Sequence, residues 1–253
     1  MDKKKKTKLV CSSAIIATTA ALGGIVLRKY INTYEKNLKS NKFVTGRIRR
    51  FGTLYLNGEK HKRPIDFINF RDIPKYNGGK IEIGDTDKDE FNKLSWVEIN
   101  ENNKKFLICD RNILKEISWN QLNEQNLVYG KVIVIEGHKY ILRLLKGGNN
   151  RKSVNESEWN NYIVNTDEIM GLPVSNEIDK VEVKDNISLE KQNGENNELW
   201  HWCGFCSFTQ DTYLKKEKFC IIRGFYANTY LNYVYKGSYY KTVGYRPVLE
   251  LIE

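Results

Sequence analysis

The sequence of 253 residues is poor in the side chains from which disulfide frameworks, metal clusters and hydrolytic sites are built. Five cysteines are too few for a disulfide-rich small protein, and the three histidines, His61, His138 and His201, stand far apart. No G-x-S-x-G, H-E-x-x-H or phosphate-binding glycine loop occurs. The sequence therefore points away from the common hydrolases and nucleotide-binding enzymes, and we assign no catalytic residue, metal ligand or cofactor from it.

The chain does contain enough apolar material for a packed domain, and its charge is concentrated at one end. Hydrophobic residues make up 40% and aromatic residues 12% of the chain, which excludes wholesale disorder. The formal net charge is +10, but residues 1–50 hold 13 Lys and Arg against Asp2 and Glu35, whereas residues 51–253 hold 28 against 29 acidic residues. Because this larger part is nearly neutral, it lacks the basic surface of a nucleic-acid-binding domain, and we expect no nucleic-acid partner.

An uncharged run from Leu9 to Leu27 follows a basic tail, residues 1–8, and ends at Arg28. A helix of this length rises about 28 Å, which matches the roughly 30 Å hydrocarbon core of a bilayer. We therefore predict that residues 9–27 are a transmembrane helix or signal anchor, which makes the membrane one partner and places the protein in the cell membrane as a single-pass protein. The alternative is a cleaved secretory signal, with the small residues around Ala20 as the cleavage site.

Charge does not decide on which side of the membrane the C-terminal region lies. Five Lys and Arg lie within about 15 residues of each end of the apolar run, so the positive-inside rule favours neither orientation. We expect an extracellular C-terminal domain, because N-terminal anchors that export their domain are the commoner design. Free cysteines favour the opposite orientation, since exported proteins usually oxidise theirs.

Beyond the apolar run, changes in composition divide the chain into three regions. Residues 28–42 are polar and suit a short stalk. Residues 43–104 contain short alternating strands with a hairpin turn at Asn57-Gly58, and they form either a small β-rich region or part of the main domain. Residues 105–253 combine short strands, two short helices and long loops, which predicts an α+β domain.

Local patterns predict several elements around and within the last region. The predicted elements are a buried strand over 104–110, a short helix capped by Ser118 and Gln121, a hairpin over 131–145 that turns at Glu136-Gly137, a second short helix over 156–163, an exposed loop over 174–197 and a last strand that begins or lies at an edge at Pro247.

Three stretches of the C-terminal region carry a resemblance to known proteins. They are ISWNQLNEQNLVYGKVIVIEGHKYILRLLKGG (117–148), ELWHW (198–202) and IIRGFYANTYLNY…VGYRPVLELI (221–252). Together they resemble a family of largely uncharacterised phage and bacterial proteins that end in an Arg-Gly…Gly-Phe-Arg-Pro pattern, matched here by Arg223-Gly224 and Gly244-Tyr245-Arg246. That ending is similar to the C-type-lectin-like fold shared by formylglycine-generating enzymes and the variable receptor-binding proteins of diversity-generating retroelements. The resemblance implies a C-type-lectin-like domain over 105–253 and says little about function, because this fold hosts unrelated activities.

The arginines and glycines of this pattern suit structural roles. Gly224 and Gly244 allow close backbone packing or a positive φ. Arg223 and Arg246 can each donate up to five hydrogen bonds, and loop-rich folds need such donors for their carbonyl groups. We therefore expect both arginines to be internal clips rather than ligand contacts.

A thiol enzyme is the alternative that the resemblance raises. In formylglycine-generating enzymes two cysteines follow the Arg-Gly pair, whereas residues 225–234 contain none, so that activity is not expected. His201, Cys203, Cys206 and Cys220 do form an H-x-C-x2-C…C set. Three interpretations of this set stay open, namely a structural zinc site, a disulfide to Cys220 and inert core thiols. The alternative function is a redox or metal-dependent enzyme that uses Cys203 and Cys206.

The aromatic stretch after Gly224 is the strongest candidate for a binding site. Tyrosine offers a flat apolar face with a hydroxyl, and asparagine adds amide hydrogen bonds, a combination common in recognition surfaces. The candidate ligand-binding residues are Tyr226, Asn228, Tyr230, Asn232, Tyr235 and Tyr239. On a regular strand Tyr226 and Tyr230 face outward only if Asn228 does too. In the resembling retroelement receptors the corresponding stretch carries the ligand-facing side chains. We therefore predict a membrane-anchored, non-catalytic binding or structural domain whose ligand is a protein or a glycan.

Overall fold

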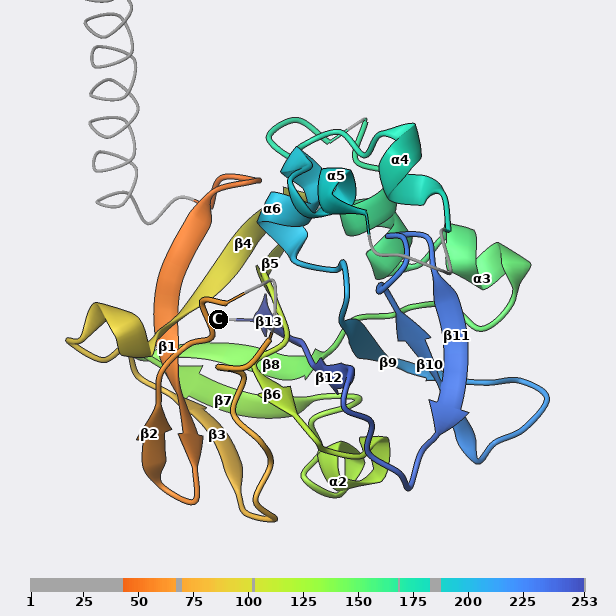
Figure 1. The fold of residues 1–253 in the computed structure, drawn as a ribbon. Helices are drawn as coiled ribbons and strands as arrows, with labels where there is room; N and C mark the ends of the chain where they lie inside the picture. The colour runs from red at the N-terminus through yellow and green to blue at the C-terminus, as the bar shows by residue number, and fades with distance from the viewer. Residues whose placement is uncertain (1–42, 67–69, 102, 168, 183–187, 253) are drawn as a thin grey trace, which may run out of the picture. The chain divides into compact units, whose positions relative to one another are not determined.

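The fold is seen in a computed structural model that describes residues 43–253, apart from 67–69, 102, 168, 183–187 and 253. The basic tail, the membrane segment and the stalk predicted for residues 1–42 lie outside the described residues. Within the described ranges, no helix is long and apolar enough to cross a membrane. Strands predominate and the helices are short (Figure 1), so the fold class is α+β, as predicted.

Most of the strands form one large sheet in the order β2-β1-β4-β5-β13-β8-β7, and β3 also pairs with β1. The strands are β1 (Ile48–Leu56), β2 (Glu59–His61), β3 (Ile81–Gly84), β4 (Lys93–Glu101), β5 (Lys104–Cys109), β7 (Lys131–Ile135), β8 (His138–Leu144) and β13 (Pro247–Leu251). Every pairing in this sheet is antiparallel. Because β4 pairs with β5, the strands of 43–104 and those of 105–253 belong to one sheet.

A smaller sheet of five strands has the order β11-β10-β9-β12-β6. Its strands are β6 (Leu114–Lys115), β9 (Cys206–Thr212), β10 (Phe219–Arg223), β11 (Leu231–Tyr235) and β12 (Val243–Tyr245). The pairing of β9 with β12 is parallel, and the others are antiparallel. The strand β11 therefore lies at an edge of this sheet, on the right of Figure 1.

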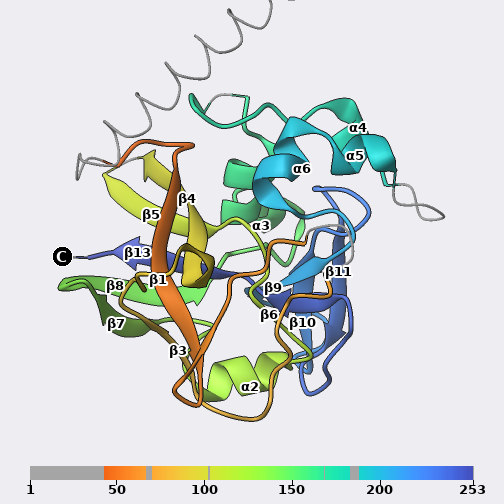
Figure 2. The ribbon, with the colours of Figure 1, turned by 60° about the vertical axis from the view of Figure 1, so that its left-hand side comes forward.

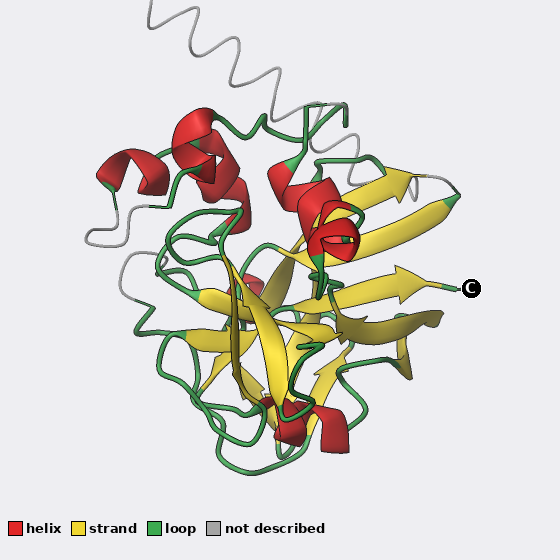
Figure 3. Ribbon diagram, turned by 90° about the vertical axis from the view of Figure 1, so that its right-hand side faces the viewer, coloured by secondary structure: helices red, strands yellow, loops and turns green. Residues whose placement is uncertain are grey.

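The helices are short, and most of them lie at two opposite ends of the fold. They are α2 (Trp119–Glu124), α3 (Arg151–Asn155), α4 (Glu177–Lys180), α5 (Leu189–Gln192), α6 (Glu195–Trp200), the 3-10 helix η1 (Glu90–Asn92) and the π-helical turn η2 (Asn160–Val164). Figures 1 and 2 show α4, α5 and α6 grouped at one end and α2 at the opposite end. Figure 3 shows the helices outside the strands, where they cover the sheets.

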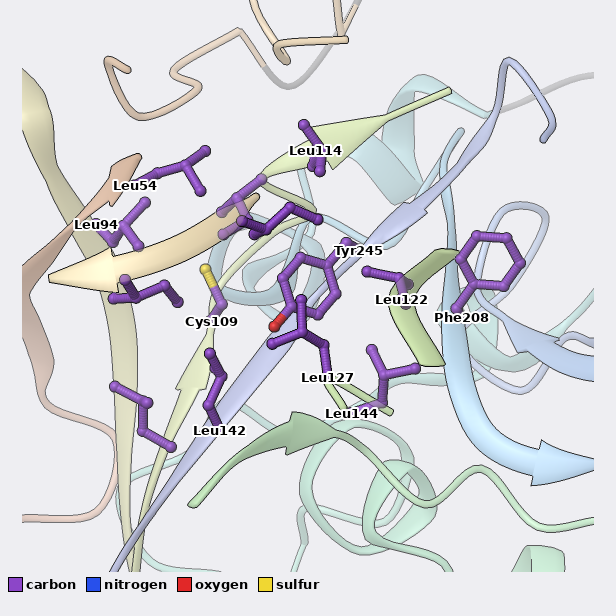
Figure 4. Packing of buried hydrophobic residues seen from close by; sticks show 14 of the residues in the cluster. Leu54, Leu94, Cys109, Leu114, Leu122, Leu127, Leu142, Leu144, Phe208 and Tyr245 are labelled. Carbon is purple, nitrogen blue, oxygen red and sulfur yellow. The ribbon is translucent and has the colours of Figure 1, made fainter. Parts of the chain in front are cut away.

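Two apolar cores lie on opposite faces of the large sheet. One core lies between the curved large sheet and the small sheet, and Figure 4 shows part of it around Cys109 and Tyr245. The other lies beneath the helices and includes Trp159 and Trp200. Alternate residues of β5 face the two cores, since Cys109 belongs to the first and Ile108 to the second. Burial on both faces explains why this strand is apolar without alternation, and the buried strand predicted over 104–110 is confirmed.

The predicted turns and the predicted helix cap are also confirmed. Asn57-Gly58 joins β1 to β2 and Glu136-Gly137 joins β7 to β8, and all four residues have φ between 51° and 81°. Two consecutive residues with positive φ give the type I′ turn that suits two-residue hairpins. At the start of α2, the Ser118 hydroxyl and the Gln121 side chain form the predicted capping box.

The prediction of an exposed loop over 174–197 was wrong. Residues 174–197 are not an exposed loop, because they contain α4, α5 and the first turn of α6. Their polar side chains are buried where they bond to the main chain, as Asn196 does when its Nδ2 donates to the Ile163 carbonyl at 2.9 Å. Such bonds to distant carbonyls hold the described helices of this region in place, and hydropathy does not reveal them. The second short helix, predicted over 156–163, is confirmed with a small shift, since residues 158–164 are helical and include η2.

Candidate functional site

One cluster of four aromatic rings, two of them exposed tyrosines from the predicted binding region, lies at one end of β9, β10 and β11. We name this cluster, Tyr213, Phe219, Tyr233 and Tyr235, the tyrosine surface. Phe219 stands directly opposite Tyr235 in the ladder, and opposite residues share a face of a sheet. Tyr213 and Tyr233 stack with their centroids 4.2 Å apart and an angle of 6° between the rings, and Phe219 meets Tyr233 edge-on at 5.6 Å. Tyr233 and Tyr235 remain 42% and 44% exposed.

The hairpin between β9 and β10 brings in two residues that were not among those predicted. The Tyr213 amide donates to the Phe219 carbonyl at 2.9 Å and closes the hairpin, which places both rings beside β11. The loop between them is exposed and contains Lys215, Lys216 and Lys218, and the Lys216 ammonium lies 5.7 Å from the centre of the Phe219 ring. The tyrosine surface therefore has a lysine-rich rim. The sequence did not reveal that Tyr213 lies beside Tyr233. The two residues are 20 positions apart, and their contact depends on how β10 pairs with β11.

The six predicted ligand-binding residues do not form one patch. Tyr235 belongs to the tyrosine surface, whereas Asn232 lies on the other face of β11, where its Nδ2 donates to the Tyr230 hydroxyl at 2.7 Å. Tyr230 meets Tyr226 edge-on at 5.2 Å, and both are half-buried. Tyr239 is 61% exposed and lies in a separate place, beside Ser118.

Asn228 is buried, so it belongs to the interior and not to the predicted surface. Its Nδ2 donates to the Ser175 hydroxyl at 2.6 Å, and its carbonyl accepts a hydrogen bond from Trp159 Nε1 at 2.7 Å. The chain from Tyr226 to Tyr230 is a loop rather than a strand. Strict alternation does not hold in a loop, and for this reason both tyrosines keep part of their surface while Asn228 points inward.

The outer edge of β11 is closed by side chains. The Tyr233 amide donates to Asn232 Oδ1 at 2.8 Å, and the Tyr235 amide donates to the Tyr240 hydroxyl at 3.2 Å. An edge strand whose outward amides are already bonded offers little to an incoming strand. The groups that this edge leaves available are therefore mainly rings and polar side chains rather than main-chain amides.

Arg223 and Arg246 are internal clips, as predicted. Arg223 donates to the Gly147 carbonyl and to Asn160 Oδ1, both at 2.7 Å. Arg246 donates to the Trp200 carbonyl at 2.6 Å and to the Asp110 carbonyl at 3.1 Å. Both guanidinium groups are buried, which lowers the pKa of Arg223 to about 9 and that of Arg246 to about 10.

The two glycines of the Arg-Gly…Gly-Tyr-Arg pattern meet different constraints. Gly224 has a φ of +87°, which L residues rarely adopt. A Cβ on Gly244 would lie 2.5 Å from the Leu114 carbonyl oxygen, so glycine allows β12 and β6 to approach each other there.

His201 is a buried neutral residue at the end of α6. It has the left-handed φ of 45° and caps the helix. Its Nε2 lies 2.9 Å from Arg111 Nη2, and because a guanidinium can only donate, the imidazole nitrogen accepts. Burial lowers the pKa of His201 to about 4, and the charges of Arg111 and Arg246 act in the same direction against an opposing effect of Asp110.

The cysteines of the H-x-C-x2-C…C set are separated by the fold. Cys203 lies in the core beneath the helices, whereas Cys206 and Cys220 lie in the core between the sheets. All three are free, as is Cys109. Burial raises the pKa of Cys203 and of Cys220 to about 12 and that of Cys206 still further. These thiols are therefore protonated at neutral pH, and a protonated thiol is a poor nucleophile.

The described side chains at these sites offer flat rings and hydrogen-bonding groups. Over the described ranges, no group of three or more His, Cys, Asp or Glu side chains is placed to hold a metal ion. The tyrosine surface has neither a general base nor an activated nucleophile among its residues. Comparison with known proteins assigns no family to the chain, because no family model, curated protein or solved structure matches it.

Proposed function

We propose that the protein is a membrane-anchored, non-catalytic binding protein that presents its tyrosine surface to a protein or glycan ligand. The observation that carries the proposal is the stacked pair of Tyr213 and Tyr233 next to Tyr235, beside the edge strand β11 of the small sheet. Soluble domains bury most of their aromatic side chains, and a cluster of exposed rings is typical of an interaction site.

The geometry of the rings favours binding in three ways. Stacking and edge-on contacts hold Tyr233 in place before a ligand arrives, which lowers the entropy cost of binding. The free ring faces suit the C–H faces of sugars as well as apolar side chains, and the hydroxyls supply hydrogen bonds. The half-buried Tyr226 and Tyr230, with Asn232, extend the same chemistry to the other face of β11.

The proposal includes the finer features that the sequence predicts. Residues 105–253 form a C-type-lectin-like domain, which is supported by the buried Arg223 and Arg246 clips and by the pairing of β5 with β13, the first and last strands of this region. Residues 9–27 anchor the protein in the cell membrane, and the domain is extracellular.

The alternative, a redox or metal-dependent enzyme built on Cys203 and Cys206, has less support. A shared metal or a thiol relay needs the two sulfurs on one side of the structure, and these lie in different cores with raised pKa values.

Glycan arrays and immobilised extracellular proteins, probed with the detergent-solubilised full-length protein, test the binding function. We expect Tyr233→Ser and Tyr235→Ser to weaken binding about tenfold or more, because exposed aromatic anchors carry much of an interface's energy. Tyr129→Ser is the matched control, since Tyr129 is 60% exposed but lies outside the tyrosine surface. Equal effects of all three variants, or loss of binding in Cys203→Ser alone, would contradict the proposal.

The orientation has its own test. Glu217 lies in the exposed loop between β9 and β10, and the four described thiols are buried. In intact cells, a membrane-impermeant maleimide should label Glu217→Cys and leave the unmodified protein almost unlabelled. Labelling of the variant only after lysis would place the domain in the cytoplasm.

A further inference from the structure

Most of the tyrosine surface belongs to a stretch of the chain without acidic residues. Between Glu217 and Glu250 the sequence contains neither Asp nor Glu, although residues 51–253 as a whole are nearly neutral. The exposed loop between β9 and β10 adds three lysines beside the rings, Lys215, Lys216 and Lys218. The surroundings of the rings are therefore positively charged in a region that is almost neutral overall.

The structure does not neutralise these lysines. Elsewhere exposed lysines pair with carboxylates, as Lys80 does with Glu82 at 2.7 Å. Within the described residues, the three lysines of the loop between β9 and β10 form no ion pair. The Lys216 ammonium lies 5.7 Å from the centre of the Phe219 ring, so its charge stands at the tyrosine surface. Clustered ammonium groups without counter-charges attract anions.

The exposed area of the rings suits a small ligand. Tyr233 and Tyr235 are 42% and 44% exposed, which for side chains of this size leaves roughly 200 Å2 uncovered. A stable interface between two proteins buries roughly 800 Å2 on each partner. A sugar, by contrast, can cover one aromatic ring by stacking a C–H face on it. The rings therefore offer enough surface for a glycan of a few units and little for a folded partner.

An acidic peptide fits this site less well, because β11 has no free edge to offer. The amides of Tyr233 and Tyr235 are already bonded to the side chains of Asn232 and Tyr240. Peptides that extend a sheet take their affinity from such amides. A glycan does not need them, because it binds through ring faces and hydroxyl groups.

We propose that the ligand of the tyrosine surface is an acidic glycan, whose sugar rings stack on Tyr233 and Tyr235 and whose carboxylate or sulfate groups bind Lys215 and Lys216. This inference rests on the proposed function, since it names the ligand of the same site. The rings hold the sugars in place, and the lysines give the preference for charge. Ion pairs between exposed groups are weak individually and are screened by salt, so we expect binding to weaken as the ionic strength rises.

An oligosaccharide array tests the inference on the full-length protein in a non-ionic detergent. It carries sialylated, uronate-containing and sulfated oligosaccharides, each beside its uncharged counterpart, which is the desialylated, methyl-esterified or unsulfated form. We expect at least one charged member to bind about tenfold more tightly than its counterpart. This preference should shrink between about 0.05 M and about 0.5 M salt, because screening shortens the range of the attraction.

Variants locate the binding, since the basic N-terminal end of the chain also attracts anions. Lys215→Gln/Lys216→Gln should lower the affinity for the charged member about fivefold or more and make its salt dependence shallower. Lys104→Gln/Lys105→Gln is the matched control, because it removes the same charge from two exposed lysines of β5, a strand of the other sheet. The control should bind as the unmodified protein does.

Three results would overturn the inference, and each says something different about the proposed function. Equal binding of charged and uncharged members, weakened by Tyr233→Ser, would mean a neutral glycan and would leave the proposed function intact. Equal losses in the two lysine double variants would mean that overall charge, and not this surface, attracts the glycan. Binding of no oligosaccharide would leave the proposed function intact only if an immobilised extracellular protein binds and Tyr233→Ser weakens that binding.

Discussion

His201 should make the folded protein lose stability in mild acid. The imidazole is 8% exposed and accepts a hydrogen bond from Arg111, and its pKa falls from 6.5 to about 4 on folding. Between these two pH values the unfolded chain binds a proton that the folded chain does not bind. Stability therefore falls as the pH is lowered through this window, and it is unaffected by His201 above it.

The size of the effect follows from the shift. A difference of this size in pKa corresponds to about 3 kcal/mol of unfolding free energy once the pH is below both values, and to about 2 kcal/mol between pH 7 and pH 5. Such a loss is a large part of the stability of an ordinary domain. The lowered pKa of His201 in the folded protein causes this loss of stability. A residue at position 201 that does not titrate should therefore abolish this part of the pH dependence.

The assay compares the full-length protein with His201→Asn by urea unfolding at several pH values. Asparagine tolerates the left-handed φ of 45° at this position, and the buried tryptophans report unfolding by fluorescence. Carboxylates titrate in both proteins, so their contribution cancels in the difference. We expect the unmodified protein to lose about 2 kcal/mol more than the variant between pH 7 and pH 5. Parallel pH profiles would refute the reasoning, because His201 would then titrate at its ordinary pKa.

Three further predictions concern the interior. Arg246→Met should destabilise the protein by about 3–5 kcal/mol in urea unfolding, since it leaves several buried carbonyls without donors; a loss below about 1 kcal/mol would mean that water replaces the guanidinium. Gly244→Ala should cost more than Gly194→Ala, because a Cβ at the first position meets a carbonyl oxygen at 2.5 Å, whereas one at the second has its nearest atom at 3.4 Å, an ordinary contact. Similar shifts in melting temperature would contradict this steric account. Cys203 and Cys206 should resist iodoacetamide at pH 8 until urea unfolds the chain, as burial raises the pKa of both thiols; rapid alkylation, mapped by peptide mass spectrometry, would show that they are accessible.

Much of the local structure was predictable because short-range chemistry decides it. Asn57-Gly58 and Glu136-Gly137 prefer the positive φ values of a tight hairpin, and the side chains of Ser118 and Gln121 bond to amides within one helical turn. In each case the interacting groups are within three residues of one another in sequence, so these features depend little on the tertiary structure.

The candidate site was only partly predictable, since its composition depends on which strands pair. The sequence indicated an aromatic region after Gly224, and Tyr235 does belong to the tyrosine surface. Tyr213 and Phe219 belong to it because the hairpin between β9 and β10 places them beside β11. Asn228 does not, because its side chain lies in a loop and bonds to Ser175 in the interior. The helices that the structure describes within 174–197 were missed for a related reason, because their buried side chains bond to carbonyls far away in sequence.

The sequence by itself determined the α+β class, the tight turns, the helix cap, the roles of Arg223 and Arg246 and the separation of a basic end from a neutral remainder. Tertiary structure alone decided which rings share a face and which cysteines are kept apart. The physical reason is the range of the interactions. Turn and capping preferences act over a few residues, whereas strand register depends on hydrogen bonds between residues more than 100 positions apart, such as Leu107 and Leu249.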